Sequence, residues 1–552
     1  MDADLVSIQE ARDAVRAAAA AQKRYKTATQ EDVDRVVAAM VEVGAAEAAR
    51  LGAMAHEETG FGKPESKTQK NLFATRTLAE RMEGMRTAGI VEKSDDGTVW
   101  TVATPMGVVA ALVPSTNPTA TAMYKAIISA KARCGIVMSP HPRAARCTAE
   151  ALRVVAEAAY GAGAPRDLFA CLGQTEAGVT LAGTDALLEH EKTDVILATG
   201  GGPMVRAAYS KGKPAYGVGS GNVPAYVDRS ANVEKAAADI LTGTSFDWGT
   251  LCSTERSVVA DSPIRSRLLD ALRERGGHVC SEAETQKLRA IIKPGGRFNT
   301  EIVGQSPRRI AEMAGFSVPE ATRALIAEAD GVGPDEPLSM ETLSPILSFY
   351  VADGWEAGCE RCIEVLEFGG IGHTLALHAT ADRVIEQFAL KKPSMRIVVN
   401  TVAALGSVGM TTALFPAMTL GPGTLGGSIT SDNVTPMHLV NLKRVAFETA
   451  PLNTEAGEPV VASGTRPAPA PRPASGAGRP APSGDGSWMD EIEARLVARA
   501  GNRQVGAANR PADAPRRPAS EPPAPPRGGE RDASTLPLSD GKIEGLIRRF
   551  RT

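Results

Sequence analysis

Aromatic residues make up only 4% of this 552-residue chain, which argues against a stacking surface for single-stranded nucleic acid. The 61 basic and 64 acidic residues leave a formal net charge of -3, so a strong attraction to nucleic acid is not implied either. No apolar run approaches the roughly 18 to 20 residues that span a bilayer, and the N-terminal segment lacks the features of a secretory signal. We therefore expect a cytoplasmic protein with no membrane partner.

Cysteine is also scarce, with seven residues scattered between Cys134 and Cys362. That number is too small for a disulfide framework, so a functional cysteine is expected to be a free thiol. Cys252 lies in the polar segment TSFDWGTLCSTERS near Arg256, where a thiol could be exposed and partly ionised, as nucleophilic catalysis requires. An inert cysteine is the alternative. Cys359 and Cys362 lack further ligands at metal-binding spacing, so no metal site is expected. We interpret both as residues that pack within a helix.

Proline is distributed unevenly, since 16 of the 37 prolines fall in residues 451–552. Segments rich in proline, alanine and glycine cannot bury enough apolar surface to fold, which predicts a disordered linker over this range. Two islands within it have apolar residues at helical spacing, at 487–500 and 540–551. Both are predicted to be short amphipathic helices.

Before this linker, short apolar runs alternate with helical patterns such as ARCTAEALRVVAEAAYGAG. Continuous apolar strands separated by helices are typical of parallel sheets covered on both faces, so we predict an α/β fold. The expected strands lie at 107–113, 135–139, 194–199, 223–227, 257–261, 346–352, 374–379 and 396–400.

Two glycine clusters follow expected strands. Thr199, Gly200, Gly201 and Gly202 come directly after strand 194–199, where free N–H groups at a helix start can bind a phosphate. A GxGxxG fingerprint is missing, so a tight structural turn is the alternative. The second cluster, GVGSGN at 217–222, contains neither an acid nor a base and is interpreted as a flexible loop.

Four polar residues are further candidates for a site. Asn117 lies between a strand and a helix, where its amide could stabilise an oxyanion or cap the helix. Glu341 precedes an expected strand, and its local sequence alone favours a solvated loop acid. His141 and His373 are interpreted as structural.

In their order along the chain, seven segments resemble the aldehyde dehydrogenase superfamily. Within it they are similar to the CoA-acylating branch found in bacterial microcompartments and in bifunctional aldehyde/alcohol dehydrogenases. The segments are ETGFGKPESKTQKN (58–71), PMGVVAALVPSTNPT (105–119), ATGGGPMVRAAYSKGKPAYGVGSGNVPAYV (198–227), SFDWGTLCSTERS (245–257), ETLSPIL (341–347), GGIGHT (369–374) and the stretch 421–444.

The resemblance implies that Cys252 attacks the aldehyde carbonyl and carries the acyl group as a thioester. Asn117 and the backbone N–H of Cys252 would then bind the oxyanion. The residues matched to cofactor contacts are Thr199, Gly200, Gly201, Glu341, Ser139, His141 and Pro142.

One departure from the family concerns the loop at 217–222. Hydrolytic members carry a glutamate there that activates water, whereas this chain has GVGSGN. A thiol is more acidic and more nucleophilic than water and needs less activation. The resemblance therefore implies oxidation of a short-chain aldehyde such as propionaldehyde, with NAD (or NADP) as cofactor and CoA as acceptor. A hydrolytic enzyme, a sulfoacetaldehyde dehydrogenase and a degenerate scaffold are the alternatives.

The resemblance also implies domains and partners. The expected regions are a dinucleotide-binding domain (1–93 and 112–222), a catalytic domain (223–430) and an oligomerisation element (94–111 and 431–450). We expect a homodimer or a tetramer. The helices in 451–552 resemble encapsulation peptides, with 540–551 as the first choice, and would bind shell or cargo proteins of a bacterial microcompartment in the cytoplasm.

Overall fold

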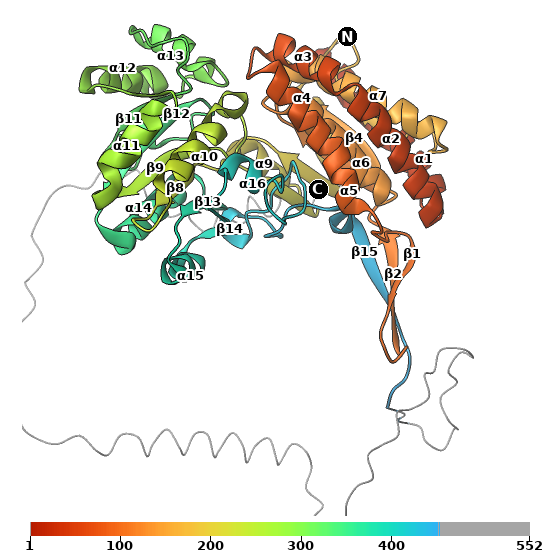
Figure 1. Ribbon diagram of the computed structural model, residues 1–552. Coiled ribbons are helices and arrows are strands. Elements are labelled where there is room, and N and C mark those ends of the chain that lie inside the picture. The colour runs from red at the N-terminus through yellow and green to blue at the C-terminus, as the bar shows by residue number, and fades with distance from the viewer. Residues whose placement is uncertain (1, 451, 453–552) are drawn as a thin grey trace, which may run out of the picture. The chain divides into compact units, whose positions relative to one another are not determined.

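The computed structural model describes residues 2–450 and 452 and contains two parallel sheets and one antiparallel sheet. Figure 1 shows the two parallel sheets, each with helices packed against it, and the antiparallel strands that extend away from them. The predicted α/β class is confirmed. The tail from 453 onward, with both expected amphipathic helices, lies outside the described residues.

The first parallel sheet has five strands. In spatial order they are β5 (Phe169–Cys171), β4 (Gly135–Pro140), β3 (Val108–Val113), β6 (Val195–Thr199) and β7 (Ala215–Val218). All six residues of β3 are buried because both faces of the sheet are covered. Val109 and Ala111 pack with α2, α6 and α7 on one face, and Val108 and Ala110 pack with α1, α8 and α9 on the other.

The second parallel sheet has seven strands. In spatial order they are β10 (Gly277–Val279), β11 (Ala324–Glu328), β12 (Ile346–Ala352), β9 (Glu255–Asp261), β8 (Val223–Val227), β13 (Gly372–His378) and β14 (Ser394–Val399). Helices α10 and α11 cover one face and helices α12 to α15 cover the other.

The helices alternate with these strands. Their bounds are α1 (Ala3–Tyr25), α2 (Gln30–Ala46), α3 (Ala48–Thr59), α4 (Pro64–Leu72), α5 (Leu78–Met82), α6 (Pro118–Lys131), α7 (Ala145–Gly161), α8 (Leu181–Glu189), α9 (Gly202–Tyr209), α10 (Val233–Ser245), α11 (Arg265–Glu274), α12 (Glu282–Ile292), α13 (Pro307–Ala314), α14 (Gly354–Gly369), α15 (Asp382–Lys391) and α16 (Ala403–Gly406). In the described part of the chain, no helix is long and apolar enough to cross a membrane.

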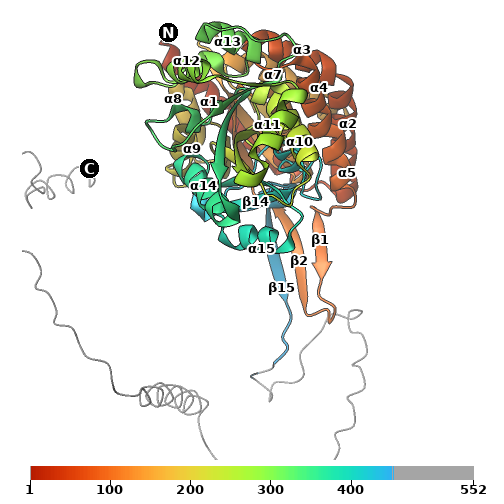
Figure 2. The same ribbon diagram turned by 60° about the vertical axis from the view of Figure 1, so that its left-hand side comes forward.

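The antiparallel sheet joins two distant parts of the chain, as Figure 2 shows from a second direction. Strand β2 (Val99–Pro105) pairs with β1 (Gly89–Lys93) on one side and with β15 (Val440–Ala446) on the other. The expected oligomerisation range 94–111 is offset from these strands, because β1 begins earlier and residues 108–111 belong to β3. The domain boundaries stay predictions.

All eight expected strands are present, with ends shifted by two residues at most. Four further strands of the two parallel sheets, β5, β7, β10 and β11, were not predicted. They have three to five residues each, too few for a recognisable period. Cys359 and Cys362 are buried in α14, which confirms the interpretation of this pair as helix packing.

Candidate active site

A cavity of about 500 Å³ lies between the two parallel sheets. Its walls come from the carboxyl ends of β3 and β6 on one side and from segments that precede β9 and β12 on the other. Because β3 and β6 are neighbours whose following connections diverge, this is the topological switch point where α/β sheets bind ligands. Seven expected site residues line the cavity: Asn117, His141, Thr199, Gly200, Gly201, Cys252 and Glu341.

Cys252 reaches the cavity from the segment that connects α10 to β9. Its Sγ lies 3.2 Å from Nε2 of His373. Burial raises the pKa of the Cys252 thiol to about 12, and the nearby Glu341 adds to this effect. This favours a protonated thiol over the partly ionised one, because desolvation of the sulfur outweighs the attraction of Arg396 and Arg256.

His373, at the start of β13, lies beside Cys252. It was interpreted as structural, yet its ring contacts the thiol of Cys252, while Nδ1 lies 2.9 Å from Oγ1 of Thr374. Burial lowers the pKa of His373 to about 3, and Arg396 lowers it further, so the imidazole is neutral at pH 7. In the tautomer that leaves Nε2 without a proton, the ring can accept a hydrogen bond from the thiol. Its position in GGIGHT, directly before a strand, was the available signal.

Asn117 occupies the N-cap position of α6, but its side chain does not cap the helix. Its Oδ1 accepts a hydrogen bond from Nζ of Lys70 at 2.5 Å, and its Nδ2 donates to the carbonyl oxygen of Thr250 at 3.3 Å. The helix-cap alternative is therefore excluded. The amide faces the segment that carries Cys252 instead.

The turn after β6 carries the expected phosphate-binding residues. Gly201 is the N-cap of α9, and Pro203 follows in the first helical turn. No side-chain hydrogen bond caps this helix, and Gly200, Gly201 and Met204 around its start line the cavity. Oγ1 of Thr199 lies 2.9 Å from Oγ1 of Thr419, which fixes the end of β6.

Glu341 contacts the glycine-rich loop at 217–222. Its Oε1 accepts a hydrogen bond from the backbone N–H of Gly221 at 2.7 Å. Burial raises the pKa of Glu341 above its ordinary value, although Arg256 and the loop hydrogen bonds oppose this. A Cβ on Gly221 would lie 1.8 Å from the carbonyl oxygen of Cys252, so the loop packs directly on the cysteine backbone.

Of the three cofactor contacts expected at the end of β4 and just after it, one lines the cavity and two do not. His141 lines the cavity, and its Nδ1 accepts from the N–H of Arg143. Ser139 is buried and pairs with Oγ1 of Thr184 at 2.8 Å, and Pro142 begins a short 3-10 helix. Neither Ser139 nor Pro142 is among the residues that line the cavity.

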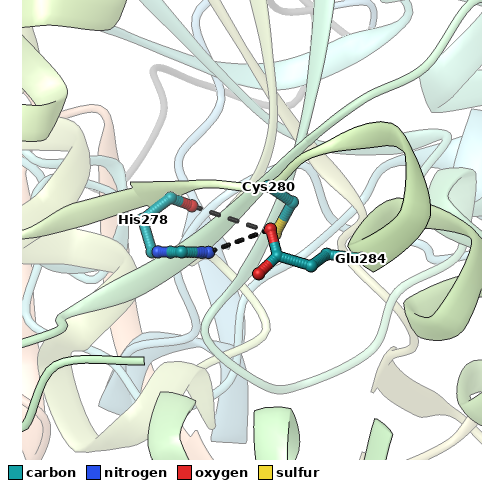
Figure 3. Close-up of side chains that lie close together, drawn as sticks. All are labelled: His278, Cys280 and Glu284. Atoms are coloured by element: carbon teal, nitrogen blue, oxygen red, sulfur yellow. Dashed lines mark hydrogen bonds and ion pairs between the residues drawn. The ribbon is translucent and has the colours of Figure 1, made fainter. Parts of the chain in front are cut away.

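Among the described residues, one group of possible metal ligands lies together: His278, Cys280 and Glu284 (Figure 3). Oε2 of Glu284 accepts hydrogen bonds from the N–H and Oγ of Ser281 and lies 3.3 Å from Nε2 of His278. This carboxylate completes the capping box of α12. Helix capping accounts for the cluster, and we assign it no metal.

The sequence model of the aldehyde dehydrogenase family matches residues 2–285 of this chain. The chain belongs to the aldehyde dehydrogenase family. This confirms the family that the sequence analysis predicted, and the cavity between the two sheets is the candidate active site of this aldehyde dehydrogenase.

Two curated relatives show how far the similarity extends. The bifunctional aldehyde-alcohol dehydrogenase AdhE of Escherichia coli K12 is 40% identical, and the match covers 77% of this chain and 48% of that protein. The succinate-semialdehyde dehydrogenase (acetylating) of Clostridium kluyveri is 34% identical over 82% of this chain and 98% of its own length. The chain thus spans about half the length of the aldehyde-alcohol dehydrogenases that it matches.

Solved structures cover the same part of the chain. An acetylating aldehyde dehydrogenase from Geobacillus thermoglucosidasius is 47% identical, with a TM-score of 0.80, over 82% of this chain and 99% of that one. A propionaldehyde dehydrogenase from Rhodopseudomonas palustris, with bound CoA and an acylated cysteine, is 28% identical with a TM-score of 0.70. The match covers 79% of this chain and 96% of that one. A propionaldehyde dehydrogenase from the fucose utilisation bacterial microcompartment of Clostridium phytofermentans is 26% identical with a TM-score of 0.71. The match covers 79% of this chain and 97% of that one.

Proposed function

We propose that this aldehyde dehydrogenase is CoA-acylating and oxidises a short-chain aldehyde to acyl-CoA. The observation that carries the proposal is the 3.2 Å contact between Sγ of Cys252 and Nε2 of His373 in the cavity beside the turn at 199–202. Aldehyde, CoA and NAD⁺ (or NADP⁺) would give acyl-CoA, the reduced cofactor and one proton. The acetylating relatives at 34% and 47% identity support this activity.

The residues around the turn at 199–202 fit a dinucleotide cofactor. Gly200 and Gly201 present backbone without side chains, and the start of α9 supplies N–H groups for a pyrophosphate. Thr199, Glu341 and His141 line the same cavity and would contact the remainder of the dinucleotide. When bound, the cofactor accepts the hydride from the substrate carbon.

In the first half reaction, Cys252 attacks the aldehyde carbonyl while its proton passes to Nε2 of His373. The new C–S bond moves an electron pair onto the carbonyl oxygen, and Nδ2 of Asn117 and the backbone N–H of Cys252 stabilise that oxygen. Loss of hydride from the tetrahedral carbon then leaves an acyl thioester on Cys252.

In the second half reaction, the thiol of CoA attacks this thioester and Sγ of Cys252 leaves. The proton of the CoA thiol passes to Sγ of Cys252, and the proton that His373 took up in the first half reaction is released to solvent. The loop at 217–222 carries no carboxylate, and Glu341 is engaged by the N–H of Gly221. No acid in this loop can activate water, whereas a thiol needs less activation. CoA is therefore the favoured acceptor over water.

Reduction of NAD⁺ by propionaldehyde, measured with and without CoA, tests the proposal. We expect acyl-CoA and NADH to form together only when CoA is present, and Cys252→Ala to abolish both. NADH formation at the same rate without CoA would indicate the hydrolytic alternative. Turnover by the Cys252→Ala variant would show that Cys252 is not the nucleophile. Sulfoacetaldehyde, offered in the same assay, tests the other substrate.

We also propose that the enzyme is a homodimer or tetramer located in a bacterial microcompartment. The exposed outer strand β15 supports self-association, and a microcompartment relative at 26% identity supports the location. Residues 540–551, or else 487–500, are the proposed docking segments. Fusing each segment to a fluorescent protein in the native host tests this, since a docking segment should produce foci that disappear when the shell proteins are deleted.

A further inference from the structure

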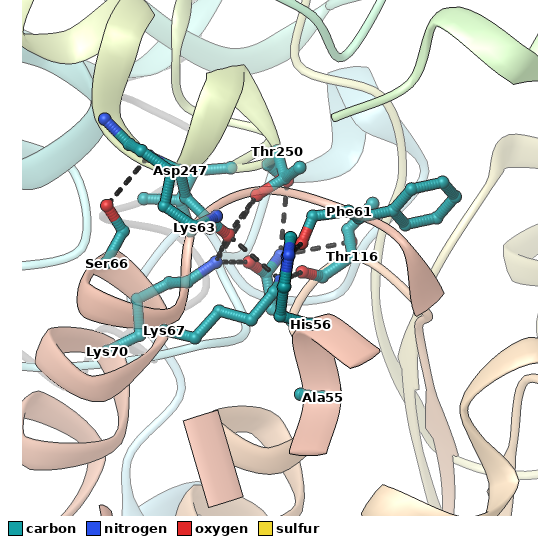
Figure 4. A network of polar contacts seen from close by, with 12 residues as sticks. Ala55, His56, Phe61, Lys63, Ser66, Lys67, Lys70, Thr116, Asp247 and Thr250 are labelled. Atoms are coloured by element: carbon teal, nitrogen blue, oxygen red, sulfur yellow. Dashed lines mark hydrogen bonds and ion pairs between the residues drawn. The ribbon is translucent and has the colours of Figure 1, made fainter. Parts of the chain in front are cut away.

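A buried ionic cluster lies beside the candidate active site, and Figure 4 shows Lys67 and Lys70 reaching from α4 toward Asp247 and Thr250. The lysines are three residues apart, so both lie on the same face of the helix. Their side chains are 3% exposed, and that of Asp247 is fully buried. Charges this deep in a protein are costly unless they are paired, which makes the cluster unusual.

Asp247 is the centre of the cluster. Its Oδ2 accepts hydrogen bonds from Nζ of Lys67 at 3.2 Å, from Nζ of Lys70 and from Oγ1 of Thr250 at 2.6 Å. Its Oδ1 accepts the backbone N–H of Lys63 at 2.7 Å. Burial alone would raise the pKa of Asp247, but Lys70 and Lys67 hold it below its usual value, so the carboxylate is ionised at pH 7.

Lys70 makes two contacts that Lys67 does not, one with Oγ1 of Thr250 at 3.3 Å and one with Asn117. Its Nζ donates to Oδ1 of Asn117 at 2.5 Å. An ammonium group has donors and no acceptor, so the amide atom that faces it must be oxygen. The amide nitrogen of Asn117 then faces the other way, toward Thr250 and Thr116, both of which line the cavity.

We propose that Lys70, held by Asp247, is a positioning residue that orients the Asn117 amide for oxyanion binding. The ammonium group fixes which end of the amide faces the substrate, and its charge polarises the amide so that Nδ2 becomes a stronger donor. Asp247 and Cys252 belong to the same connection between α10 and β9, so one carboxylate aligns the nucleophile with the oxyanion donor. This inference rests on the proposed function.

A purely structural ion pair is the competing explanation, and Lys67 provides the matched control. It contacts the same oxygen of Asp247 and is equally buried, but its other hydrogen bond goes to the carbonyl oxygen of Thr116 at 3.2 Å. If the lysines only stabilise the fold, removing either one should have similar consequences.

The experiment compares Lys70→Met with Lys67→Met in the full-length protein, using NADH formation with propionaldehyde and CoA. We expect Lys70→Met to lower kcat by about 100-fold, as removal of an oxyanion donor does, with little change in the KM for aldehyde. Lys67→Met should stay within a few-fold of the wild-type kcat. Equal losses in the two variants would overturn the inference.

A double-mutant comparison tests whether Lys70 acts through Asn117. In the Asn117→Ala background, Lys70→Met should lower kcat by less than about threefold, because the amide that it orients is already absent. A full additional loss would overturn the inference. Lys70→Gln, whose amide can still donate to Oδ1 of Asn117, should recover part of the activity.

Two further measurements separate the possible failures. If Lys70→Met does not fold, Lys70→Met combined with Asp247→Asn removes the unpaired buried carboxylate and should still show the loss of kcat. Alkylation of Cys252 by iodoacetamide should be unchanged in both variants, because the thiol is intact. Wild-type kcat in Asn117→Ala would contradict the proposed oxyanion role itself, whereas a slow Asn117→Ala beside a fully active Lys70→Met would contradict only this inference.

Discussion

At the scale of single residues, the pair of Cys252 and His373 determines the chemistry of the site. The raised thiol pKa and the lowered imidazole pKa act in the same direction, so both groups are neutral at pH 7. Both directions disfavour a preformed thiolate–imidazolium pair. In the proposed mechanism the thiol therefore loses its proton as the new C–S bond forms, and the free thiol is expected to react slowly with electrophiles.

The pH dependence of alkylation tests this state of Cys252. Because its pKa is raised to about 12, the thiolate fraction should rise about tenfold per pH unit throughout pH 7 to 9. Iodoacetamide labelling followed by mass spectrometry should show that slope without a plateau. The Cys252→Ala variant measures labelling at the other cysteines. A plateau near pH 8 would show that the thiol is activated.

Replacement of His373 tests its role as the base. We expect His373→Ala to lower kcat by at least 100-fold, the usual contribution of general acid–base catalysis, with a small change in KM. His378, buried at the other end of the same strand, is the control, since the pKa of His378 is also lowered, to about 4. His378→Ala should retain most of the activity. Similar kcat values for the two variants would contradict the assignment.

At the scale of elements, the segment between α3 and α4 packs against Asp247, in the turn that precedes Cys252. Gly60 and Gly62 both have positive φ, at 69° and 70°. A Cβ on Gly62 would lie 1.9 Å from Oδ1 of Asp247, whereas a Cβ on Gly60 would meet no atom within 4 Å. Gly62 therefore allows the backbone of Lys63 to reach the buried carboxylate.

Alanine at these two positions separates backbone strain from steric overlap. Gly60→Ala should cost about 1 kcal/mol of unfolding free energy, from the left-handed conformation alone. Gly62→Ala should cost about 3 kcal/mol, because overpacking against Asp247 is added, and it should also lower kcat. Urea unfolding followed by circular dichroism measures both values. Equal destabilisation would show that Asp247 moves aside without cost.

At the scale of the whole molecule, the site is assembled from two sheets and five separate segments of the sequence. The carboxyl ends of β3 and β6 supply the cofactor turn and Asn117, and the segments before β9, β12 and β13 supply Cys252, Glu341 and His373. Every residue assigned a role in catalysis or cofactor binding lies before residue 374.

Removal of residues 451–552 should therefore leave kcat and the KM values for aldehyde and CoA within twofold of the full-length enzyme. Steady-state assays on both proteins, at equal concentrations and after size-exclusion chromatography, provide the comparison. A large loss of activity in the truncated protein with an unchanged oligomeric state would show that the tail contributes to catalysis.

The sequence by itself determined the features that depend on local pattern. Apolar runs such as 108–113 and 195–199 must be buried on both faces, which indicated a parallel sheet, and the turn at 199–202 followed directly from its glycines. The resemblance of seven segments to one family located Cys252, Asn117 and Glu341, all of which line the cavity.

Only the tertiary structure decided how these residues behave. Cys252 and His373 are 121 positions apart, and Lys70 and Asn117 are 47 apart, so no local pattern could pair them. The sequence left the ionisation of Cys252 open because a pKa depends on desolvation, and desolvation depends on which chain segments fold over the sulfur. Sequence specifies which groups are present, whereas packing sets their distances and their protonation.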